Sequence, residues 1–560
     1  MQGDCTAVGP WPLALGLRGR GGRRRGGQAA LQRDRGNHEN AGAMSETPLR
    51  LAELVSSLSL ATDLGMGQPM EQAQRTCIFS VRVAHRLALR EAEVSDVYYL
   101  ALLRFIGCTS DAHEAALAAG GDEIGDHAGV APVLMGEMSE FLRYLLRDFA
   151  AETPLLTRAR LVTHGIVSGR QKARSSIAAH CEVAGMLAKQ LGLPEAIGTY
   201  VGSTFERWDG KGLPGERAGE DIPLPARIVS VARDAEIFHR LGGTEMARDV
   251  LTRRKGKSYD PAVVEAALAV ARQWPGETEA RSGLEAMLDA EPVPRVMVED
   301  DGFDRVLGAF ASFTDMKTPY SLGHSPRVAE LAREAARRAG LPTAAAVDVR
   351  RAGLVHDLGK AGVPNGILEK KTELSAAEWE RMRLHPYLTE RILAQSPALK
   401  RLAPLAGSHH ERLDGSGYHR GVTGESLSMG ARILAAANLY EALGEDRPHR
   451  PSLVAEERVK AVRAEADAGR LDPDAVRRVL EAAGQATQRR RRAWPNGLTD
   501  REVDVLRLVS RGSSNRMVAE RLVISPKTVG RHVENIYGKI NVSSRASAAL
   551  FALQHDLLND

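Results

Sequence analysis

Residues 352–364, AGLVHDLGKAGVP, place a His-Asp pair at the end of an apolar run and then turn through a glycine and a lysine. A neutral imidazole beside a carboxylate suits divalent metal ions, because the carboxylate can bridge two ions while the imidazole holds one. Alone, the pair His356-Asp357 is a weak signal, since most such pairs on helices are solvated or capping residues. Further histidines in apolar, helix-like stretches strengthen it, namely His324, His385, His409 and His410. The sequence therefore predicts a metal site here.

The composition favours a helical protein of several domains. The 560 residues are 43% hydrophobic and 26% charged, and this length allows roughly three or four domains. Aromatic residues make up only 4%, while Ala, Leu, Arg and Glu abound, which favours helices over sheets. The net charge is only +4, so any affinity for nucleic acid must come from a local patch. We predict an all-α fold.

Cysteine usage and hydropathy indicate the compartment. The four cysteines, Cys5, Cys77, Cys108 and Cys181, show neither metal-site nor disulfide spacing, which fits a reducing environment. No apolar segment approaches the ~20 residues needed to span a bilayer. We therefore expect a cytoplasmic protein without a membrane partner.

Residues 1–43 are rich in Gly and Arg and lack periodicity. This composition predicts a disordered tail, with Met44 as the expected start of translation. A basic arm that binds nucleic acid is the alternative interpretation.

The chain contains an internal repeat. Residues 205–232, FERWDGKGLPGERAGEDIPLPARIVSVA, align without a gap with residues 410–437, HERLDGSGYHRGVTGESLSMGARILAAA. Apolar residues recur at helical spacing in both halves. We predict two copies of one helical domain, at 44–275 and 302–484, joined by a linker at 276–301.

The two copies differ where the metal chemistry would be. In the first copy Phe79 replaces His324, Arg104-Phe105 replaces His356-Asp357, Cys108 replaces Lys360, and Thr204-Phe205 replaces His409-His410. Only His385 keeps an equivalent, His180. Phenylalanine and arginine cannot hold a cation, so the first copy cannot assemble this site. We expect it to be a scaffold, with ligand binding in a vestigial cleft as the alternative.

The second copy carries what phosphodiester hydrolysis needs. Two or more metal ions can bind phosphoryl oxygens, acidify a water and orient it in line with the leaving group. Such a site requires neutral imidazoles, a bridging carboxylate and a nearby cation, for which Lys360 is available.

At these residues the second copy resembles the HD-GYP family of metal-dependent phosphohydrolases. The matching segments are HSPRVAELA (324–332), HDLGKAGVP (356–364), HPYLTERIL (385–393), HHERLDGSGYHRG (409–421) and ARILAAANLYEAL (431–443). The resemblance covers roughly 302–484 strongly, and about 70–275 as a degenerate copy. It implies an all-α fold, a centre of two or three iron or manganese ions, and hydrolysis of cyclic di-GMP.

The resemblance also implies roles for single residues. Asp357 and Lys360 would be catalytic, and Lys360, Tyr418 and Arg432 would contact the substrate. The implied metal ligands are His324, His356, Asp357, His385, His409 and His410, with Asn438 at the position of a further ligand.

Two departures bear on activity. The late metal-binding Asp of the family is Asn438 here, and an amide oxygen is a poorer ligand than a carboxylate. The Gly-Tyr-Pro signature reads Gly417-Tyr418-His419, and His419 is either a loop residue or an extra ligand. Three alternatives follow: an active phosphodiesterase, a catalytically impaired transcription factor gated by a ligand or metal, and a scaffold for dimerisation.

The C-terminal part has a different character. Residues 485–497 form a basic linker, and residues 498–560 are predicted to form about four short helices. Thr499 with Glu502 predicts a capping box, and Ser525 before Pro526 predicts the start of another helix. This unit resembles the LuxR-type helix-turn-helix domain.

In that unit residues 518–522 would be the scaffold helix and 526–539 the recognition helix. Gly530 stands early in the recognition helix, where it weakens helix formation. We expect binding to DNA as a homodimer, with a small helical interaction domain as the alternative. The predicted DNA contacts are Lys527, Thr528, Arg531, His532, Asn535 and Lys539.

Overall fold

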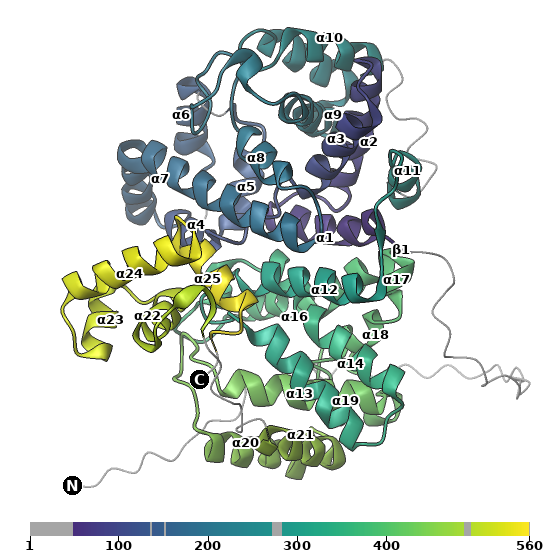
Figure 1. The fold of residues 1–560 in the computed structure, drawn as a ribbon, viewed down its shortest axis with the longest axis vertical. Helices are drawn as coiled ribbons and strands as arrows, with labels where there is room; N and C mark the ends of the chain where they lie inside the picture. Colours follow the sequence, from purple (N-terminus) through teal and green to yellow (C-terminus); the bar gives the residue numbers. More distant parts are fainter. Residues whose placement is uncertain (1–48, 135–136, 151–152, 272–282, 486–493, 559–560) are drawn as a thin grey trace, which may run out of the picture. The chain divides into compact units, whose positions relative to one another are not determined.

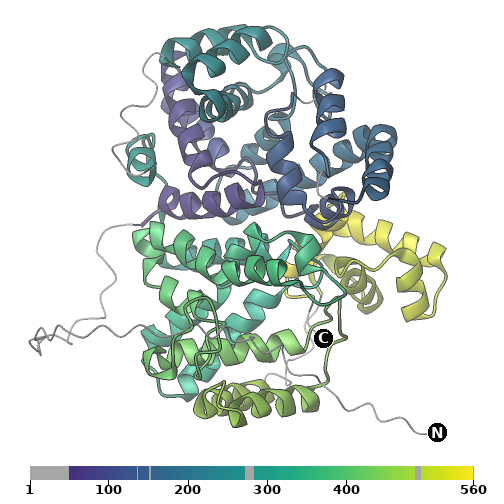
Figure 2. The ribbon, with the colours of Figure 1, turned by 180° about the vertical axis from the view of Figure 1, so that it is seen from behind.

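A computed structural model describes residues 49–134, 137–150, 153–271, 283–485 and 494–558 (Figure 1). Helices dominate this part of the chain, as the view from behind also shows (Figure 2), and the all-α prediction is confirmed. The described residues contain one two-stranded antiparallel sheet, in which β1 (Leu49–Arg50) pairs with β2 (Met297–Val298). The predicted N-terminal tail, 1–43, lies outside the described residues.

The first copy is helical in its described residues. Its elements are α1 (Leu51–Gly65), α2 (Gln72–Arg86), α3 (Glu91–Leu103), α4 (Ala112–Ala118), α5 (Glu123–Val130), α6 (Met138–Arg147), α7 (Leu155–Gln190), α8 (Ala196–Ser203), η1 (Gly219–Asp221), α9 (Leu224–Arg254) and α10 (Pro261–Val270).

The second copy is likewise helical in its described residues. Its elements are α12 (Asp300–Asp315), α13 (His324–Arg338), α14 (Thr343–Val355), η3 (Leu358–Gly362), α15 (Asn365–Leu368), α16 (Ala376–Gln395), α17 (Pro397–Lys400), α18 (Ala403–Gly407), η4 (Gly424–Ser426), α19 (Met429–Leu443), α20 (Ala455–Asp467) and α21 (Pro473–Gln485).

A shared backbone contact relates the two copies. A Cβ atom at Gly359 would overlap the carbonyl oxygen of His385, and a Cβ atom at Gly107 would overlap that of His180. Each glycine thus lets the turn after the third long helix of its copy approach the helix that carries the histidine. The same close approach is built twice, as the repeat predicts.

The region predicted as a linker, 276–301, carries structure in its described part. It contains α11 (Gly283–Asp289) and β2, and α11 packs on the first copy. The hydroxyl of Tyr98 donates to the carbonyl of Met287 (3.2 Å), and Nε of Arg50 donates to Glu291 (2.7 Å). This helix is only seven residues long, and contacts with residues far away in the sequence hold it in place.

The C-terminal unit has the expected helices. They are η5 (Pro495–Gly497), α22 (Asp500–Ser510), α23 (Asn515–Leu522), α24 (Pro526–Ile540) and α25 (Arg545–Gln554). The capping box predicted at Thr499 and Glu502 is present, and Ser525 caps α24 through its hydroxyl, which accepts from the N–H of Thr528. The scaffold helix α23 starts three residues earlier than predicted, because Ser514 caps it.

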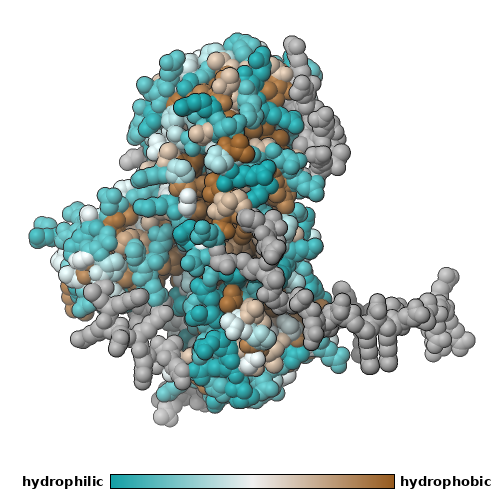
Figure 3. Space-filling model, turned by 45° about the vertical axis from the view of Figure 1, so that its right-hand side comes forward, coloured by the Kyte–Doolittle hydropathy of each residue, from teal (hydrophilic) through white to brown (hydrophobic). Residues whose placement is uncertain are grey.

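Hydrophobic side chains are mostly internal. On the face drawn in Figure 3, hydrophilic residues surround smaller hydrophobic areas. Among the described helices, none is long and apolar enough to cross a membrane.

Candidate metal centre

Five separate segments of the second copy deliver the predicted ligands to one place. His324 is the first residue of α13, after Gly323 in a left-handed conformation (φ 75°). His356 and Asp357 lie between α14 and η3, and His385 lies in the middle of α16. His409 and His410 follow the short helix α18, and Asn438 lies on α19. His356 is fully buried and Asp357 is 2% exposed, so the centre lies inside the domain.

The ligands form two groups that share one carboxylate. His324, His356 and Asp357 form one group, and His385, His409 and His410 form the other. Oδ2 of Asp357 lies 3.3 Å from Nε2 of His356 and 3.8 Å from Nε2 of His324. Its other oxygen, Oδ1, lies 3.6 Å from Nε2 of His385 and 3.4 Å from Nε2 of His409. Asp357 therefore stands between the groups, where a bridging carboxylate would.

Backbone carbonyls orient three of the imidazoles. Nδ1 of His356 lies 2.8 Å from the carbonyl oxygen of Gly353, and Nδ1 of His385 lies 2.6 Å from that of Met382. Nδ1 of His409 lies 2.6 Å from the carbonyl oxygen of Ala406. Because a carbonyl can only accept, each Nδ1 must carry a proton, and in the neutral ring Nε2 then presents the lone pair. This is the tautomer that a metal-binding histidine needs.

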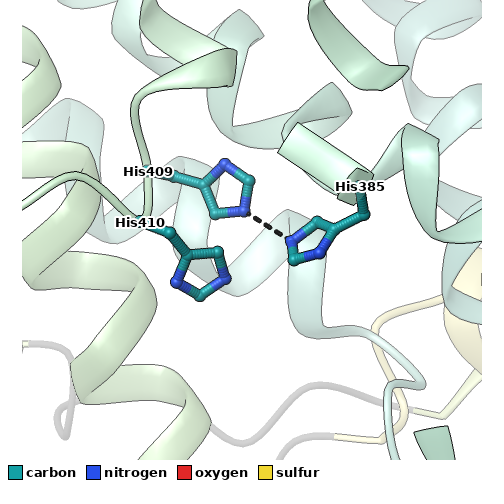
Figure 4. A group of neighbouring side chains, drawn as sticks. All are labelled: His385, His409 and His410. Carbon is teal, nitrogen blue, oxygen red and sulfur yellow. Dashed lines mark hydrogen bonds between the residues drawn. The ribbon is translucent and has the colours of Figure 1, made fainter. Parts of the chain in front are cut away.

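The lone pairs face one another. Nε2 of His385 and Nε2 of His409 are 3.1 Å apart, and Figure 4 shows the two rings pointing together with His410 beside them. Two unprotonated nitrogens at this distance repel each other. Nε2 of His356 and Oδ1 of Asp357 are also buried without a hydrogen-bond partner. A cation among these atoms would satisfy all of them, so the donor set fits divalent metal ions.

The charge states agree with this fit. Burial lowers the pKa of His385 and His410 well below the usual range and lowers the pKa of His409 to about 4. These imidazoles are therefore neutral at physiological pH. Burial alone would raise the pKa of Asp357, but His356 and Lys360 outweigh it and hold this pKa well below its usual range. The carboxylate is therefore ionised.

Of the three predicted substrate-contacting residues, Lys360 and Tyr418 lie at the centre, whereas Arg432 is engaged elsewhere. Nζ of Lys360 lies 2.5 Å from Oδ2 of Asp357, at the edge of the centre. The ring of Tyr418 stacks on His410, with centroids 4.7 Å apart. Arg432 instead donates to Asp472 (2.8 Å) and to the carbonyl oxygens of residues 424 and 427. Its guanidinium is engaged in holding the loop, which argues against a phosphate contact.

Asn438 and Glu445 both contact the ring of His324. Oδ1 of Asn438 lies 2.9 Å from Nε2 of His324, within the first group. Glu445 was not anticipated from the sequence: its Oε1 accepts from Nδ1 of His324 (2.8 Å) and fixes that ring. Glu445 lies two residues beyond the end of α19 and outside the quoted motifs, so no sequence pattern pointed to it. His419 lies 3.4 Å from Glu390 rather than within either group.

The helix-turn-helix unit exposes most of its predicted DNA contacts. Lys527, Thr528, Arg531 and Asn535 are exposed on α24, and His532 is half-buried. Val529, Ile536 and Ile540 are buried on the opposite face of the helix. Lys539 differs, because its Nζ donates to Glu502 (2.7 Å) and to the carbonyl of Gly497 (2.9 Å). Its ammonium holds η5 and α22 to the recognition helix.

Comparison with known proteins decides the family. A family model described as "HD domain" matches residues 170–263 and 309–475, and a model described as "Bacterial regulatory proteins, luxR family" matches residues 496–552. A 3'3'-cGAMP-specific phosphodiesterase of Vibrio cholerae is 32% identical over 418 residues, which is 73% of this chain and 90% of that protein. The chain belongs to the HD-GYP family. Because the HD match falls in both copies, the internal repeat of this HD-GYP protein is confirmed.

Two further relatives match different lengths of the chain. A cyclic di-GMP phosphodiesterase of Pseudomonas aeruginosa is 35% identical over 179 residues, and the HD-GYP chain spans 43% of its length. The crystal structure of a cyclic GMP-AMP-specific phosphodiesterase of Vibrio cholerae superposes with a TM-score of 0.55 at 27% identity. That likeness covers 78% of this chain and 99% of the other, so the tandem helical fold extends over the whole of that structure.

Proposed function

We propose that the second copy hydrolyses a cyclic dinucleotide in a metal-dependent reaction, and that the LuxR-type unit binds DNA. The observation that carries the first part is the position of Asp357, with one carboxylate oxygen toward each histidine group. A carboxylate between two groups of imidazoles is the arrangement that a centre of two or more divalent ions requires.

The residues of the chain would divide the work as follows. His324, His356, His385, His409 and His410 would hold two or three divalent ions, iron or manganese by family resemblance, which when bound supply an activated water and neutralise phosphate charge. Lys360 would pair with a phosphate oxygen, since its ammonium lies at the edge of the centre and is 16% exposed. Tyr418, stacked on His410, would border the bound nucleotide.

The substrate class follows from the chemistry and from the relatives. The resemblance seen in the sequence implies cyclic di-GMP, whereas the relative that shares the greater part of the chain is named for 3'3'-cGAMP. Both are cyclic dinucleotides with two phosphodiester links, so we propose this class. The proposal is tested by measuring metal content and the hydrolysis of both compounds. Both measurements use wild-type protein purified without oxygen and, as the control, the Asp357→Ala variant.

The expected result is about two or more iron or manganese ions per chain, hydrolysis of at least one dinucleotide, and loss of both properties in Asp357→Ala. A wild-type protein without stoichiometric metal would overturn the proposal. Metal without hydrolysis would favour the second candidate, a ligand- or metal-gated transcription factor, for which Asn438 is the specific observation.

The proposal for DNA rests on α24. Its exposed Lys527, Thr528 and Arg531 follow a capped N-terminus, where a recognition helix presents side chains to phosphates and base edges. We propose paired half-sites and a homodimer, because such modules read symmetric sites. Gel-shift and analytical ultracentrifugation measurements test both parts.

A further inference from the structure

Two arginines occupy metal-ligand positions in the first copy. Arg104 stands where the second copy has His356, and extending the gapless alignment by one residue places Arg233 opposite Asn438. A guanidinium cannot bind a cation, but it carries the positive charge that a metal ion would otherwise supply. The first copy has therefore exchanged a removable charge for fixed ones.

Arg104 is buried and Arg233 is half-buried, and both guanidiniums are incompletely paired. Arg104 is 6% exposed, and its Nη2 donates to the carbonyl oxygen of Thr204 (3.3 Å). Its Nε and Nη1, together with Nε of Arg233, are buried without a hydrogen-bond partner. Native proteins seldom leave such donors unpaired, since each one forfeits its hydration.

The nearby carboxylate of Asp234 pairs with Arg233 but not with Arg104. One oxygen of Asp234 accepts from Nη1 of Arg233 (2.6 Å), while the other accepts from Arg254 (3.1 Å) and from the hydroxyl of Tyr259. The nearby carboxylate is thus shared between two other arginines. Burial, with Arg233 close by, lowers the pKa of Arg104 to about 9, so its guanidinium still carries charge at neutral pH.

The surroundings hold Arg104 in place. The rings of Phe105 and Phe205 lie 5.2 and 5.4 Å from its Cζ. His180, which retains the position of His385, also has its Nε2 buried and unpartnered. The hydroxyl of Ser230 donates to the same Thr204 carbonyl oxygen (2.9 Å) that accepts from Arg104. Ser230 and Tyr259 line a small pocket together with Trp208 and Arg227.

We propose that the first copy is a phosphate-binding site, in which Arg104 and Arg233 grip one phosphate group where the second copy would use metal ions. Oxygens of a tetrahedral oxyanion match the free donors of both guanidiniums. The ligand class is a phosphate group, either inorganic phosphate or the phosphodiester of a cyclic dinucleotide. The inference does not depend on hydrolysis by the second copy.

The test uses the full chain carrying Asp357→Ala, so that the metal centre does not contribute. Binding of inorganic phosphate, cyclic di-GMP and 3'3'-cGAMP is measured separately by calorimetry and by the shift in Tm. Arg104→Met and Arg233→Gln remove the proposed donors, and Arg104→Lys keeps only the charge. Arg351→Met is the matched control, because that buried guanidinium already pairs with Asp304 (2.7 Å).

At least one phosphate compound should bind and raise Tm, with affinity falling about tenfold or more in Arg104→Met and Arg233→Gln. Arg104→Lys should lie between, and Arg351→Met should bind like the parent. Binding of inorganic phosphate identifies the free anion as a ligand, and binding of a dinucleotide alone identifies the phosphodiester. Without ligand, Arg104→Met should melt at a higher temperature than the parent, because an unpaired buried charge is removed.

Failure of all three compounds to bind the parent at millimolar concentration overturns the proposal. Equal binding by Arg104→Met overturns it as well, and so does a lower Tm of Arg104→Met without ligand, which would show that the guanidinium is already paired.

Discussion

Asn438 is the residue on which the activity of the second copy depends most directly. Its amide oxygen faces His324 at 2.9 Å, within the group that also contains Asp357. Asn438→Asp should add a negative charge to the centre, increase metal retention and raise turnover about tenfold or more. Metal content and initial rates check this. In the Asp357→Ala background the same change should restore neither, and an unaltered metal content in the single variant would contradict the assignment of this position.

Glu445 acts on the same group from outside. Its carboxylate accepts from Nδ1 of His324 and also pairs with Arg327 (2.5 Å). Glu445→Gln should weaken metal affinity about 10–100-fold, since partners behind a ligand fix its orientation. Competition with a chelator measures this. Glu441→Gln is the control, because Glu441 pairs with Arg327 without contacting His324, and equal losses in both variants would show a merely structural effect.

Single residues differ in how far the sequence could reveal them. His324, His356, Asp357, His409 and His410 could be identified because the twin copy replaces each of them. Arg233 could be found by extending the repeat alignment by one residue, whereas Glu445 could not, since it matches no motif and gains its role only when distant segments meet. Lys539 looked available for DNA by its place in the helix, yet Glu502 binds its ammonium.

At the scale of elements, the recognition helix α24 carries a weak point. Gly530 lies in its second turn, and a Cβ there would meet nothing closer than Nδ2 of Asn515 at 4.0 Å. Gly530→Ala should therefore stabilise the unit by about 1 kcal/mol. Thermal unfolding measures it. Gly512→Ala is the control and should destabilise, because Gly512 has φ 82° and its Cβ would press on Pro319.

DNA binding also belongs to α24. Lys527→Ala and Arg531→Ala should each weaken binding and reduce the slope of log affinity against log salt by about 1. Titrations at several salt concentrations measure this. Lys371→Ala removes an exposed charge of the second copy and should change neither quantity. Unchanged slopes in both α24 variants would indicate a protein-binding helix instead.

Helix starts were predictable where a cap decides them, as at Thr499 and Ser525, because capping is local. The helix α11 escaped prediction, because its stability comes from Tyr98 and other residues far away in sequence.

At the scale of the molecule, a buried ion pair joins the two copies. Glu123 on α5 accepts from Nζ of Lys317 (2.9 Å), and the two side chains are 1% and 3% exposed. The same carboxylate accepts from the N–H of Asn365 (3.0 Å), at the start of α15 and close after η3. The first copy therefore holds the segment that follows Lys360, so its position bears on the metal centre.

Lys317→Met should leave Glu123 charged, buried and without its cation, and should lower the free energy of unfolding by about 3–5 kcal/mol. Adding Glu123→Gln removes that charge and should recover part of the loss. Lys370→Met breaks a pair about one-quarter exposed, with Glu378, and should cost below about 1 kcal/mol. Urea denaturation and metal content distinguish two outcomes. If Lys317→Met destabilises the fold and also releases metal, the first copy supports the centre; if the centre keeps its metal, the ion pair serves only the packing of the copies.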